Sequence, residues 1–225
     1  MTLVPNRRTI LSAFWVTWAC CHLSAAQAQL PRELRVLSYN IHVGRGMDGR
    51  LDLPRIADII LAVEPHVVAL QEVDQGAART EHVDQPAELA RLTGMKCVFA
   101  RNIDHDGGGY GTAVLTRLPI KGAEHHRLPS HYQGEQRGVQ VVELGAGDDT
   151  VVFFATHLDF RGNDGERLAS VEKIHAIADS YGDRPMLLVG DLNATPDSTT
   201  LARFAERWRS ANDQPLATFP AETPT

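Results

Sequence analysis

Six polar side chains that could carry chemistry follow four separate apolar runs of this 225-residue chain. Each run is short and ends at turn-forming residues, a pattern typical of a buried strand. In chain order, the six residues are Asn40, Glu72, His157, Asp159, Asp191 and Asn193. Ligands of open α/β sheets bind beyond the carboxyl ends of the strands. Polar residues at four such ends therefore favour one functional site over unrelated turn residues.

The residue types suit chemistry on a charged group with help from a metal ion. Carboxylate and amide oxygens, such as those of Glu72 and Asn40, suit a hard divalent cation, Mg²⁺ or Mn²⁺. A histidine and an aspartate, such as His157 and Asp159, can transfer a proton or orient a water. A neutral donor such as Asn193 can stabilise charge on a phosphoryl group. Each residue alone has a plainer explanation, as a turn residue, a surface carboxylate or a core histidine.

The overall charge argues against a protein that binds nucleic acid avidly. The formal net charge is -6, and residues 1–28 hold two arginines and no acidic residue, which leaves -8 for the remainder. An acidic surface repels phosphate backbones unless a local basic groove or a divalent cation offsets it. A hydrophobic content of 43% and a charged content of 22% are ordinary for a globular domain that builds a core.

Residues 1–28 have the pattern of a signal peptide. Arg7 and Arg8 form a positive region, residues 10–23 are mostly apolar, and Ala26-Gln27-Ala28 offers a small-x-small cleavage site. The alternative, a membrane anchor, is disfavoured because the apolar stretch is short and interrupted by polar residues. We expect cleavage after Ala28, export to the periplasm or the medium by the Sec or the twin-arginine route, and no transmembrane span thereafter. The remaining domain would cover residues 29–225.

Cysteine usage predicts no intramolecular disulfide in the exported protein. Cys20 and Cys21 leave with the signal peptide, so Cys97 remains alone. Because Cys97 lies in an apolar, strand-like stretch, we expect a core thiol rather than a nucleophile.

The first half of the domain reads as a strand–helix–strand unit. Residues 34–40 and 67–70 are the predicted strands, and a helix begins between them at Asp52 and Pro54. Its predicted core face is the set Ile56, Ile59, Ile60 and Val63, at helical spacing. A second helix is predicted over residues 86–92 and ends at Gly94.

The second half is predicted to be mostly antiparallel sheet, followed by helices. Short strands are expected at residues 97–100, 112–116, 120–126, 139–144 and 150–156. Residues 164–180 and 198–208 are predicted helices, separated by the strand that leads into Asp191. The glycine-rich segment at residues 105–111 lacks the Lys-Ser/Thr of a phosphate-binding loop, so we interpret it as a hairpin tip. The mixture predicts a single domain of two packed sheets flanked by helices.

Six short motifs in a fixed order resemble those of the endonuclease/exonuclease/phosphatase superfamily. They are SYNIH (38–42), LQEVD (70–74), GTAVLTR (111–117), QRG (136–138), THLD (156–159) and GDLNATPDS (190–198). The resemblance runs from residue 34 to about residue 219. It implies a four-layer α/β/β/α sandwich of two mostly antiparallel mixed sheets. It also implies metal-dependent hydrolysis of a phosphate ester by direct attack of water.

The resemblance also implies a role for each candidate residue. Glu72 would be the principal metal ligand, with Asn40 assisting at the metal or the phosphate. His157 would contact the scissile phosphate, Asp191 would orient or activate the attacking water, and Asn193 would hold both.

Three further residues match positions near the site in this superfamily. Arg137 and Glu135 occupy a position that often orients the site, and Arg79 lies near the pocket in many members. The expected substrate is a small phosphate ester or a phospholipid headgroup. The protein is expected to be a monomer. Nucleic acid, cleaved by a secreted nuclease, is the alternative that the acidic charge disfavours.

Two departures from the superfamily pattern bear on activity. Thr112 stands where members often have Asn, and no Ser-Asp-His motif follows Asp191. No histidine follows His175. The motif normally supplies a catalytic histidine and a final strand. Its absence predicts either a fragment, with a sandwich incomplete at the C-terminus, or a catalytically impaired relic that binds phosphate or metal.

Overall fold

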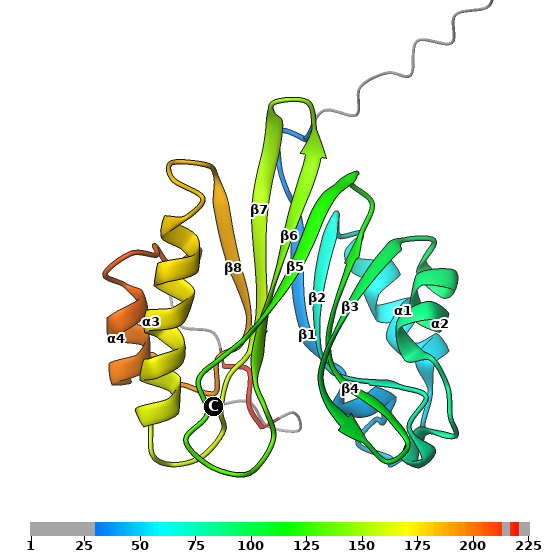
Figure 1. Ribbon diagram of the computed structural model, residues 1–225. Helices are drawn as coiled ribbons and strands as arrows, with labels where there is room; N and C mark the ends of the chain where they lie inside the picture. Colours follow the sequence, from blue (N-terminus) through cyan, green and yellow to red (C-terminus); the bar gives the residue numbers. More distant parts are fainter. Residues whose placement is uncertain (1–29, 213–216, 221–225) are drawn as a thin grey trace, which may run out of the picture.

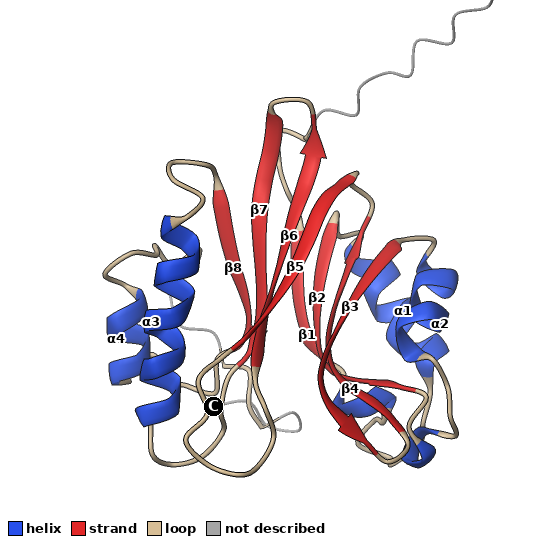
Figure 2. Ribbon diagram, viewed as in Figure 1, coloured by secondary structure: helices blue, strands red, loops and turns tan. Residues whose placement is uncertain are grey.

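The computed structural model describes residues 30–212 and 217–220, and the predicted signal peptide lies outside these residues. Two four-stranded sheets face each other, with helices on their outer sides (Figures 1 and 2). This arrangement is the predicted α/β/β/α sandwich. Within the described residues, no helix combines the length and the apolar character needed to cross a membrane.

The first sheet has the strand order β1-β2-β4-β3. Its strands are β1 (Val36–Asn40), β2 (Val67–Gln75), β3 (Lys96–His105) and β4 (Gly108–Thr116). β1 and β2 are parallel, whereas β4 runs antiparallel to both of its neighbours. Helices α1 (Leu53–Val63) and α2 (Gln85–Thr93) cover its outer face, and two short 3-10 turns are η1 (His42–Gly44) and η2 (Ala78–Thr80) (Figure 1).

The second sheet has the order β5-β6-β7-β8. Its strands are β5 (Ile120–Arg127), β6 (Gly138–Ala146), β7 (Asp149–His157) and β8 (Met186–Asp191). β7 and β8 are parallel, and the other pairs are antiparallel. Helices α3 (Gly165–Asp179) and α4 (Thr199–Phe204) cover the outer face. The chain thus fills one sheet with β1 to β4 and the other with β5 to β8.

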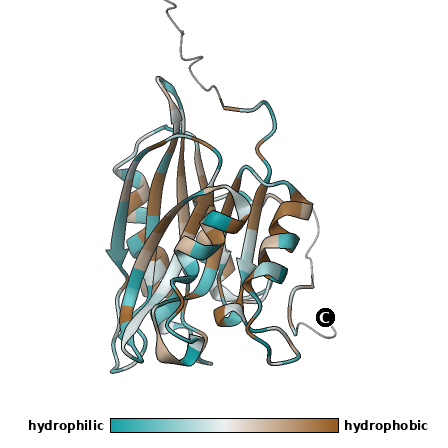
Figure 3. Cartoon of the chain, turned by 90° about the vertical axis from the view of Figure 1, so that its right-hand side faces the viewer, coloured by the Kyte–Doolittle hydropathy of each residue, from teal (hydrophilic) through white to brown (hydrophobic). Residues whose placement is uncertain are grey.

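The central strands have continuous apolar sequences because both of their faces are buried. In β7, Phe153 packs into the core between the sheets, whereas its neighbour Phe154 packs under α3 and α4. Val67 and Val68 of β2 divide in the same way between the inner core and the core under α1. Figure 3 shows the apolar residues gathered along the strands and along one side of the helices. Burying each such Phe contributes about 1.5–3 kcal/mol.

The helix starts agree with the sequence, but the buried face of α1 differs from the prediction. The Asp52 side chain accepts a hydrogen bond from the backbone N–H of Arg55 and caps α1. Ile59 and Val63, predicted on the core face, are 42% and 43% exposed. The buried set is Leu53, Ile56, Ala57 and Ile60. The predicted helical spacing was therefore right, but the buried face begins at Leu53 and not at Ile56. The first turn of α1 is packed against the core under the helix.

Three other predicted boundaries were wrong. β2 extends to Gln75 instead of ending at residue 70, because a bulge lets the chain continue alongside β4. Most of the glycine-rich segment at residues 105–111 lies in β3 and β4, although the predicted hairpin is present and turns at Asp106 and Gly107. The last helix ends at Phe204, and Trp208 reaches the core under α3 without being helical.

The strands that carry the candidate residues all end at the same end of the sandwich. β1, β2, β7 and β8 run in the same direction, toward the lower end of the molecule in Figure 1. β1 also lies against β8 across the two sheets. The loops that can surround a site are therefore the six connections at this end, which follow β1, β2, β3, β5, β7 and β8.

Cys97 offers a test of the core under α1 and α2, against which its side chain packs. Burial, with a smaller contribution from Asp84, raises the pKa of its thiol to about 12. Because the thiolate is the reactive form, we expect iodoacetamide at pH 8 to label Cys97 only after unfolding in guanidinium. Peptide mass spectrometry would measure the labelling separately from that of Cys20 and Cys21. Equal labelling rates in the folded and unfolded protein would contradict this packing.

Candidate active site

Glu72 reaches the site through a bulge in β2. The register between β2 and β4 shifts between Leu70 and Val73, and Glu72 has a left-handed φ of 57°. A bulge bends its strand and re-aims a side chain. The prediction that Glu72 follows the strand was therefore wrong. Glu72 lies within β2, and the bulge gives its side chain a direction that strict alternation would not.

Asn40 joins the two sheets at this end. Its Nδ2 donates to Glu72 Oε1 at 2.8 Å and to Asp191 Oδ2 at 3.1 Å. Its Oδ1 accepts a hydrogen bond from the backbone N–H of His42 at 3.0 Å. One amide thus holds two carboxylates that come from β2 of one sheet and β8 of the other. These three residues were predicted from strand ends, and the structure brings them together.

The two carboxylates and the amide fit a hard divalent cation. The two like charges repel each other, and a bound cation would offset this repulsion. Among the described residues, Glu72 has no cationic partner within ion-pair distance. Groups of three or more His, Cys, Asp or Glu side chains that could hold a metal do not occur in the described part of the chain. Mg²⁺ is usually held by only one or two carboxylates plus water and substrate phosphate.

Asp191 lies between Asn40 and His157. The Nε2 atom of His157 is 3.8 Å from Asp191 Oδ2. Gly190, with a φ of 152°, allows β8 to come this close to β7, because a Cβ there would lie 2.0 Å from the carbonyl oxygen of Thr156. Any larger residue at position 190 would therefore move Asp191 away from His157.

The turn after β8 holds Asn193 in place. The backbone N–H of Asn193 donates to Asp191 Oδ1 at 3.0 Å, and its Nδ2 donates to the carbonyl of Leu158 at 3.0 Å. The residue adopts a left-handed φ of 48°, which asparagine tolerates better than most residues. Asn193 is thereby tied to the ends of both β7 and β8, and one amide proton is left for a ligand.

His157 is neutral at pH 7. Burial and the nearby positive charge of Arg137 lower its pKa to about 4, although Asp191 acts in the opposite direction. A neutral imidazole can donate one hydrogen bond and accept another. His157 is thus suited to contact an anionic group through its N–H.

Buried Arg137 forms an ion pair with the partly exposed Glu135 beside His157. Arg137 Nη1 lies 2.5 Å from Glu135 Oε1, while its buried Nε has no hydrogen-bond partner among the residues that the structure describes. Burial raises the pKa of Glu135, and the negative charge of Glu72 adds to this effect. The pair therefore lies within electrostatic reach of both the His157 side and the Glu72 side of the site.

Arg79 is anchored near Glu72, as the resemblance implied. Its Nε and Nη2 donate to the two oxygens of buried Asp74 at 2.8 Å, and Thr80 also donates to that carboxylate. Its guanidinium lies over the ring of Tyr110. Hydrogen bonding to Asp74 raises the pKa of Arg79, and Glu72 contributes to the rise. No role was predicted for Asp74 or Tyr110, although Asp74 is the last residue of the LQEVD motif and Tyr110 directly precedes GTAVLTR.

Asp159 is turned toward a different set of partners. Its Oδ1 accepts hydrogen bonds from the Tyr132 hydroxyl at 3.1 Å and from Arg161 Nε at 3.2 Å. Its carboxylate has no hydrogen bond to His157 or Asp191. The structure therefore groups Asn40, Glu72, His157, Asp191 and Asn193, and it places Asp159 in the neighbouring loops.

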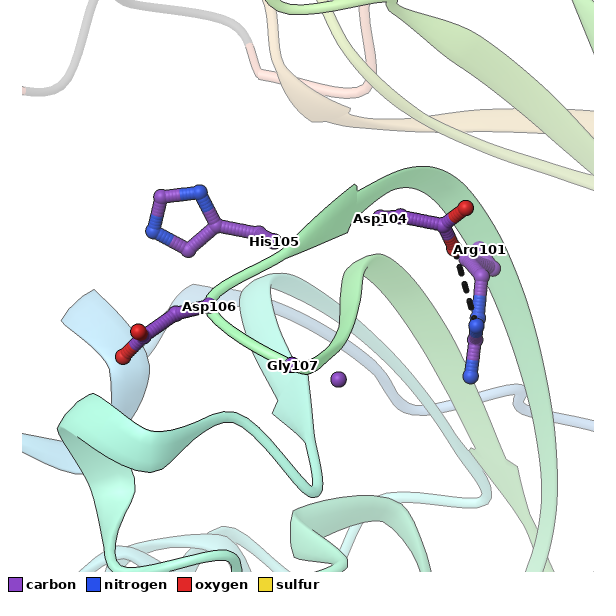
Figure 4. Close-up of a pocket in the computed structure, with 6 residues that line it drawn as sticks. Arg101, Asp104, His105, Asp106 and Gly107 are labelled. Carbon is purple, nitrogen blue, oxygen red and sulfur yellow. Dashed lines mark hydrogen bonds and ion pairs between the residues drawn. The ribbon is translucent and has the colours of Figure 1, made fainter.

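Two cavities flank this end of the sandwich. One of about 480 Å³ lies at the tip of the β3–β4 hairpin. There Arg101 pairs with Asp104 on one side, and His105 and Asp106 point to the other (Figure 4). A second, of about 360 Å³, lies between the β5–β6 and β7–α3 loops and includes Tyr132 and Asp159. The first cavity is lined by the first sheet's hairpin and the second by loops of the second sheet, and neither is lined by Glu72, Asp191 or His157.

The two facing sheets flanked by helices match the α/β sandwich of solved endonuclease/exonuclease/phosphatase proteins. The chain belongs to the Endonuclease/Exonuclease/phosphatase family, whose family model matches residues 37–225. Members of this family are hydrolases that act on phosphate esters, and they generally use divalent metal ions.

Three relatives illustrate the likeness. The chain is 29% identical to the uncharacterized protein YbhP of Escherichia coli, over 84% of this chain and 80% of that protein. It is 25% identical to the 5'-tyrosyl-DNA phosphodiesterase of Caenorhabditis elegans, over 85% of this chain and 52% of that protein. A solved endonuclease/exonuclease/phosphatase from Beutenbergia cavernae superposes with a TM-score of 0.62 at 28% identity, over 77% of this chain and 52% of that one. The chain thus spans about half the length of the last two proteins.

The neutral state of His157 predicts a pH-dependent stability. Its pKa lies near 4 in the folded protein and near 6.5 without the fold, so the unfolded chain binds more protons between these values. In chelator, the free energy of unfolding should be fully retained above pH 6.5 and should fall by up to about 3 kcal/mol toward pH 4. Denaturant titrations across this range, with His157→Gln as comparison, measure the effect. The same pH slope in both proteins would contradict it.

Proposed function

We propose that this protein is a divalent-metal-dependent phosphoesterase that hydrolyses its substrate by direct attack of water. The observation that carries the proposal is the single amide of Asn40 that holds Glu72 and Asp191 together at 2.8 and 3.1 Å. An arrangement that concentrates two carboxylates beside a neutral histidine suits a cation and an anionic substrate better than it suits a purely structural role.

Glu72 would hold the metal, Mg²⁺ or Mn²⁺, through its carboxylate oxygens, and Asn40 would assist by holding Glu72 and Asp191 in place through its Nδ2. Bound there, the cation supplies positive charge that stabilises the phosphoryl oxygens as negative charge develops on them. This assignment is supported by the oxygen-only donor set and by the cationic partner that Glu72 lacks among the described residues.

The other residues would bind the phosphate and move one proton. Asp191 accepts a proton from the attacking water, and Asn193 orients that water with its remaining amide proton. His157 donates a hydrogen bond to a phosphoryl oxygen. As the new P–O bond to water forms, the ester P–O bond breaks and the leaving alkoxide takes a proton from solvent. Asp191 then returns its proton to solvent, so each turnover consumes one water.

The proposal includes export from the cytoplasm. The arginine pair, the apolar stretch and the Ala26-Gln27-Ala28 site support it. Expression of the full chain followed by N-terminal sequencing tests it. A mature protein that begins at Gln29 outside the cytoplasm is expected, and an unprocessed cytoplasmic chain would contradict it.

A nuclease activity is the second candidate, favoured by the likeness to a tyrosyl-DNA phosphodiesterase. The charge of -8 outside the predicted signal peptide argues against it. Cleavage of supercoiled DNA that falls steeply with added salt would favour this second candidate. Hydrolysis of bis(p-nitrophenyl) phosphate without DNA cleavage would favour a small-ester phosphoesterase.

Metal binding can be measured without turnover. We expect Mn²⁺ or Mg²⁺ to raise the Tm of the wild-type protein, because a ligand that binds only the folded state stabilises it. Glu72→Gln should abolish the rise. Glu64→Gln, which changes an exposed carboxylate at the end of α1, should retain it. An equal rise in all three proteins would contradict a cation at Glu72.

Asp191 and Asp159 are expected to differ in their effect on the chemical step. Asp191→Asn removes the proton acceptor and should lower kcat on bis(p-nitrophenyl) phosphate by about 10² or more. Asp159→Asn should retain most of kcat and lower the Tm, because its carboxylate binds Tyr132 and Arg161 instead. Similar losses of kcat in the two variants would contradict the proposed roles.

A further inference from the structure

Arg79 is held in one orientation by contacts from several elements at the end of the first sheet. Its Nε and Nη2 donate to the two oxygens of Asp74, in β2, at 2.8 Å. Its backbone N–H donates to Asp106 of the β3–β4 hairpin at 2.5 Å, and its backbone carbonyl accepts from Arg45 Nη2 at 2.6 Å. Its guanidinium carbon lies 5.1 Å from the centroid of the Tyr110 ring. The position of this guanidinium is therefore fixed before any ligand binds.

The anchor of this guanidinium is a fully buried carboxylate. The Asp74 side chain has no exposed surface, and it accepts a third hydrogen bond from the Thr80 hydroxyl. Removing a carboxylate from water is unfavourable, so such an ion pair adds little stability compared with apolar residues of the same size. The η2 turn is also closed by backbone hydrogen bonds of its own. The position that Asp74 gives to Arg79 explains the pair better than stability does.

The guanidinium of Arg79 keeps donors that a ligand can reach. Its side chain is 36% exposed, and Nη1 has no hydrogen bond to any residue that the structure describes. Arginine presents its N–H donors in one planar fork, so the donors that Asp74 does not use lie on another edge of the same plane. That edge matches the oxygens of a second anion, and its fixed orientation reduces the entropy lost on binding.

Arg79 is the accessible positive charge beside Glu72. Its anchor Asp74 follows Glu72 by two residues in β2, and Arg79 lies within electrostatic reach of Glu72. Arg137, the other arginine near the site, has a side chain that is only 6% exposed and is paired with Glu135. A phosphate that approaches Glu72 meets negative charge, which an accessible cationic side chain offsets. Arg79 is placed to provide this charge from the first sheet.

We propose that Arg79 binds a phosphate oxygen of the substrate through Nη1, and that Asp74 is the positioning residue that fixes its guanidinium for this contact. This inference deepens the proposed function and depends on it. Since His157 would contact the phosphate from the second sheet, the phosphate would be held by side chains of both sheets. If the Asp74–Arg79 pair were only structural, its variants would change stability and leave phosphate binding as it is.

Arg79→Lys separates phosphate binding from stability in the full protein. The lysine ammonium can still pair with Asp74, so the Tm should stay close to that of the wild type. Lysine lacks the second arm of the fork. We therefore expect the KM for bis(p-nitrophenyl) phosphate and the inhibition constant of inorganic phosphate, both in Mg²⁺, to rise by about tenfold or more, with a smaller change in kcat. Wild-type values of both constants in this variant would overturn the inference.

Asp74→Asn tests the positioning role, because it keeps the charge of Arg79 and removes its anchor. We expect the inhibition constant of inorganic phosphate to rise several-fold, and an unchanged constant would overturn this role. If this variant does not fold, the double variant Asp74→Asn/Arg79→Gln, which leaves no buried charge unpaired, should show the loss seen in Arg79→Lys. The matched control is Arg91→Gln, since Arg91 donates to both oxygens of Glu88 on α2 in the same way. It should alter neither constant.

Failure of the inference and failure of the proposed function have different signatures. Ester hydrolysis that requires Glu72, with the same KM in the wild type and in Arg79→Lys, would overturn the inference alone. If the wild-type protein hydrolyses no ester, calorimetric titration with inorganic phosphate in Mg²⁺ still decides the inference. Binding that Arg79→Lys weakens and Arg91→Gln retains supports it, and absence of binding to the wild type overturns it.

Discussion

One amide, that of Asn40, links the two sheets at the end where the candidate residues meet. It donates to Glu72 from the first sheet and to Asp191 from the second. Two carboxylates close to one another are unfavourable unless something between them compensates their charge. Asn40 provides neutral donors to both, and a divalent cation would provide the opposite charge. The relative position of the two sheets therefore determines whether the site exists at all.

The backbone at this end adopts conformations that most residues avoid. His42, Val43, Glu72 and Asn193 all have positive φ values, between 47° and 57°. Left-handed conformations of such residues are unfavourable and persist where the surrounding structure enforces them. Here they lie at the ends of β1 and β8 and at the bulge of β2. There the backbone N–H groups of His42 and Asn193 donate to Asn40 and Asp191, and the Glu72 side chain accepts from Asn40. The well-packed strands on either side, buried on both faces, stabilise the fold enough to hold them.

Much of the fold and the site could be predicted, because strand ends and caps are local features. The apolar runs before Asn40, His157 and Asp191 identified the strands, and Asp52 and Gly94 marked helix ends as expected. Other features depend on tertiary contacts. The bulge at Glu72 arises from pairing with β4, so no single run of sequence encodes it.

The direction of a side chain beyond a strand end was equally hidden in the sequence. Asp159 follows His157 by two residues, yet its carboxylate accepts hydrogen bonds from Tyr132 and Arg161, which lie in two different loops, and not from His157. Ile59 and Val63 are exposed because a different face of α1 packs against the sheet. Tertiary packing decided these cases, whereas the order of the motifs predicted the family and the fold.

The account depends most on a cation held between the two sheets beside Asn40. A crystal structure of the full chain with Mn²⁺, with anomalous data collected at the manganese edge, tests this directly. The account predicts a single strong anomalous peak within about 2.5 Å of a Glu72 oxygen and on the side that faces Asp191. An ordered site with no peak there, or with manganese only at surface histidines, would contradict it.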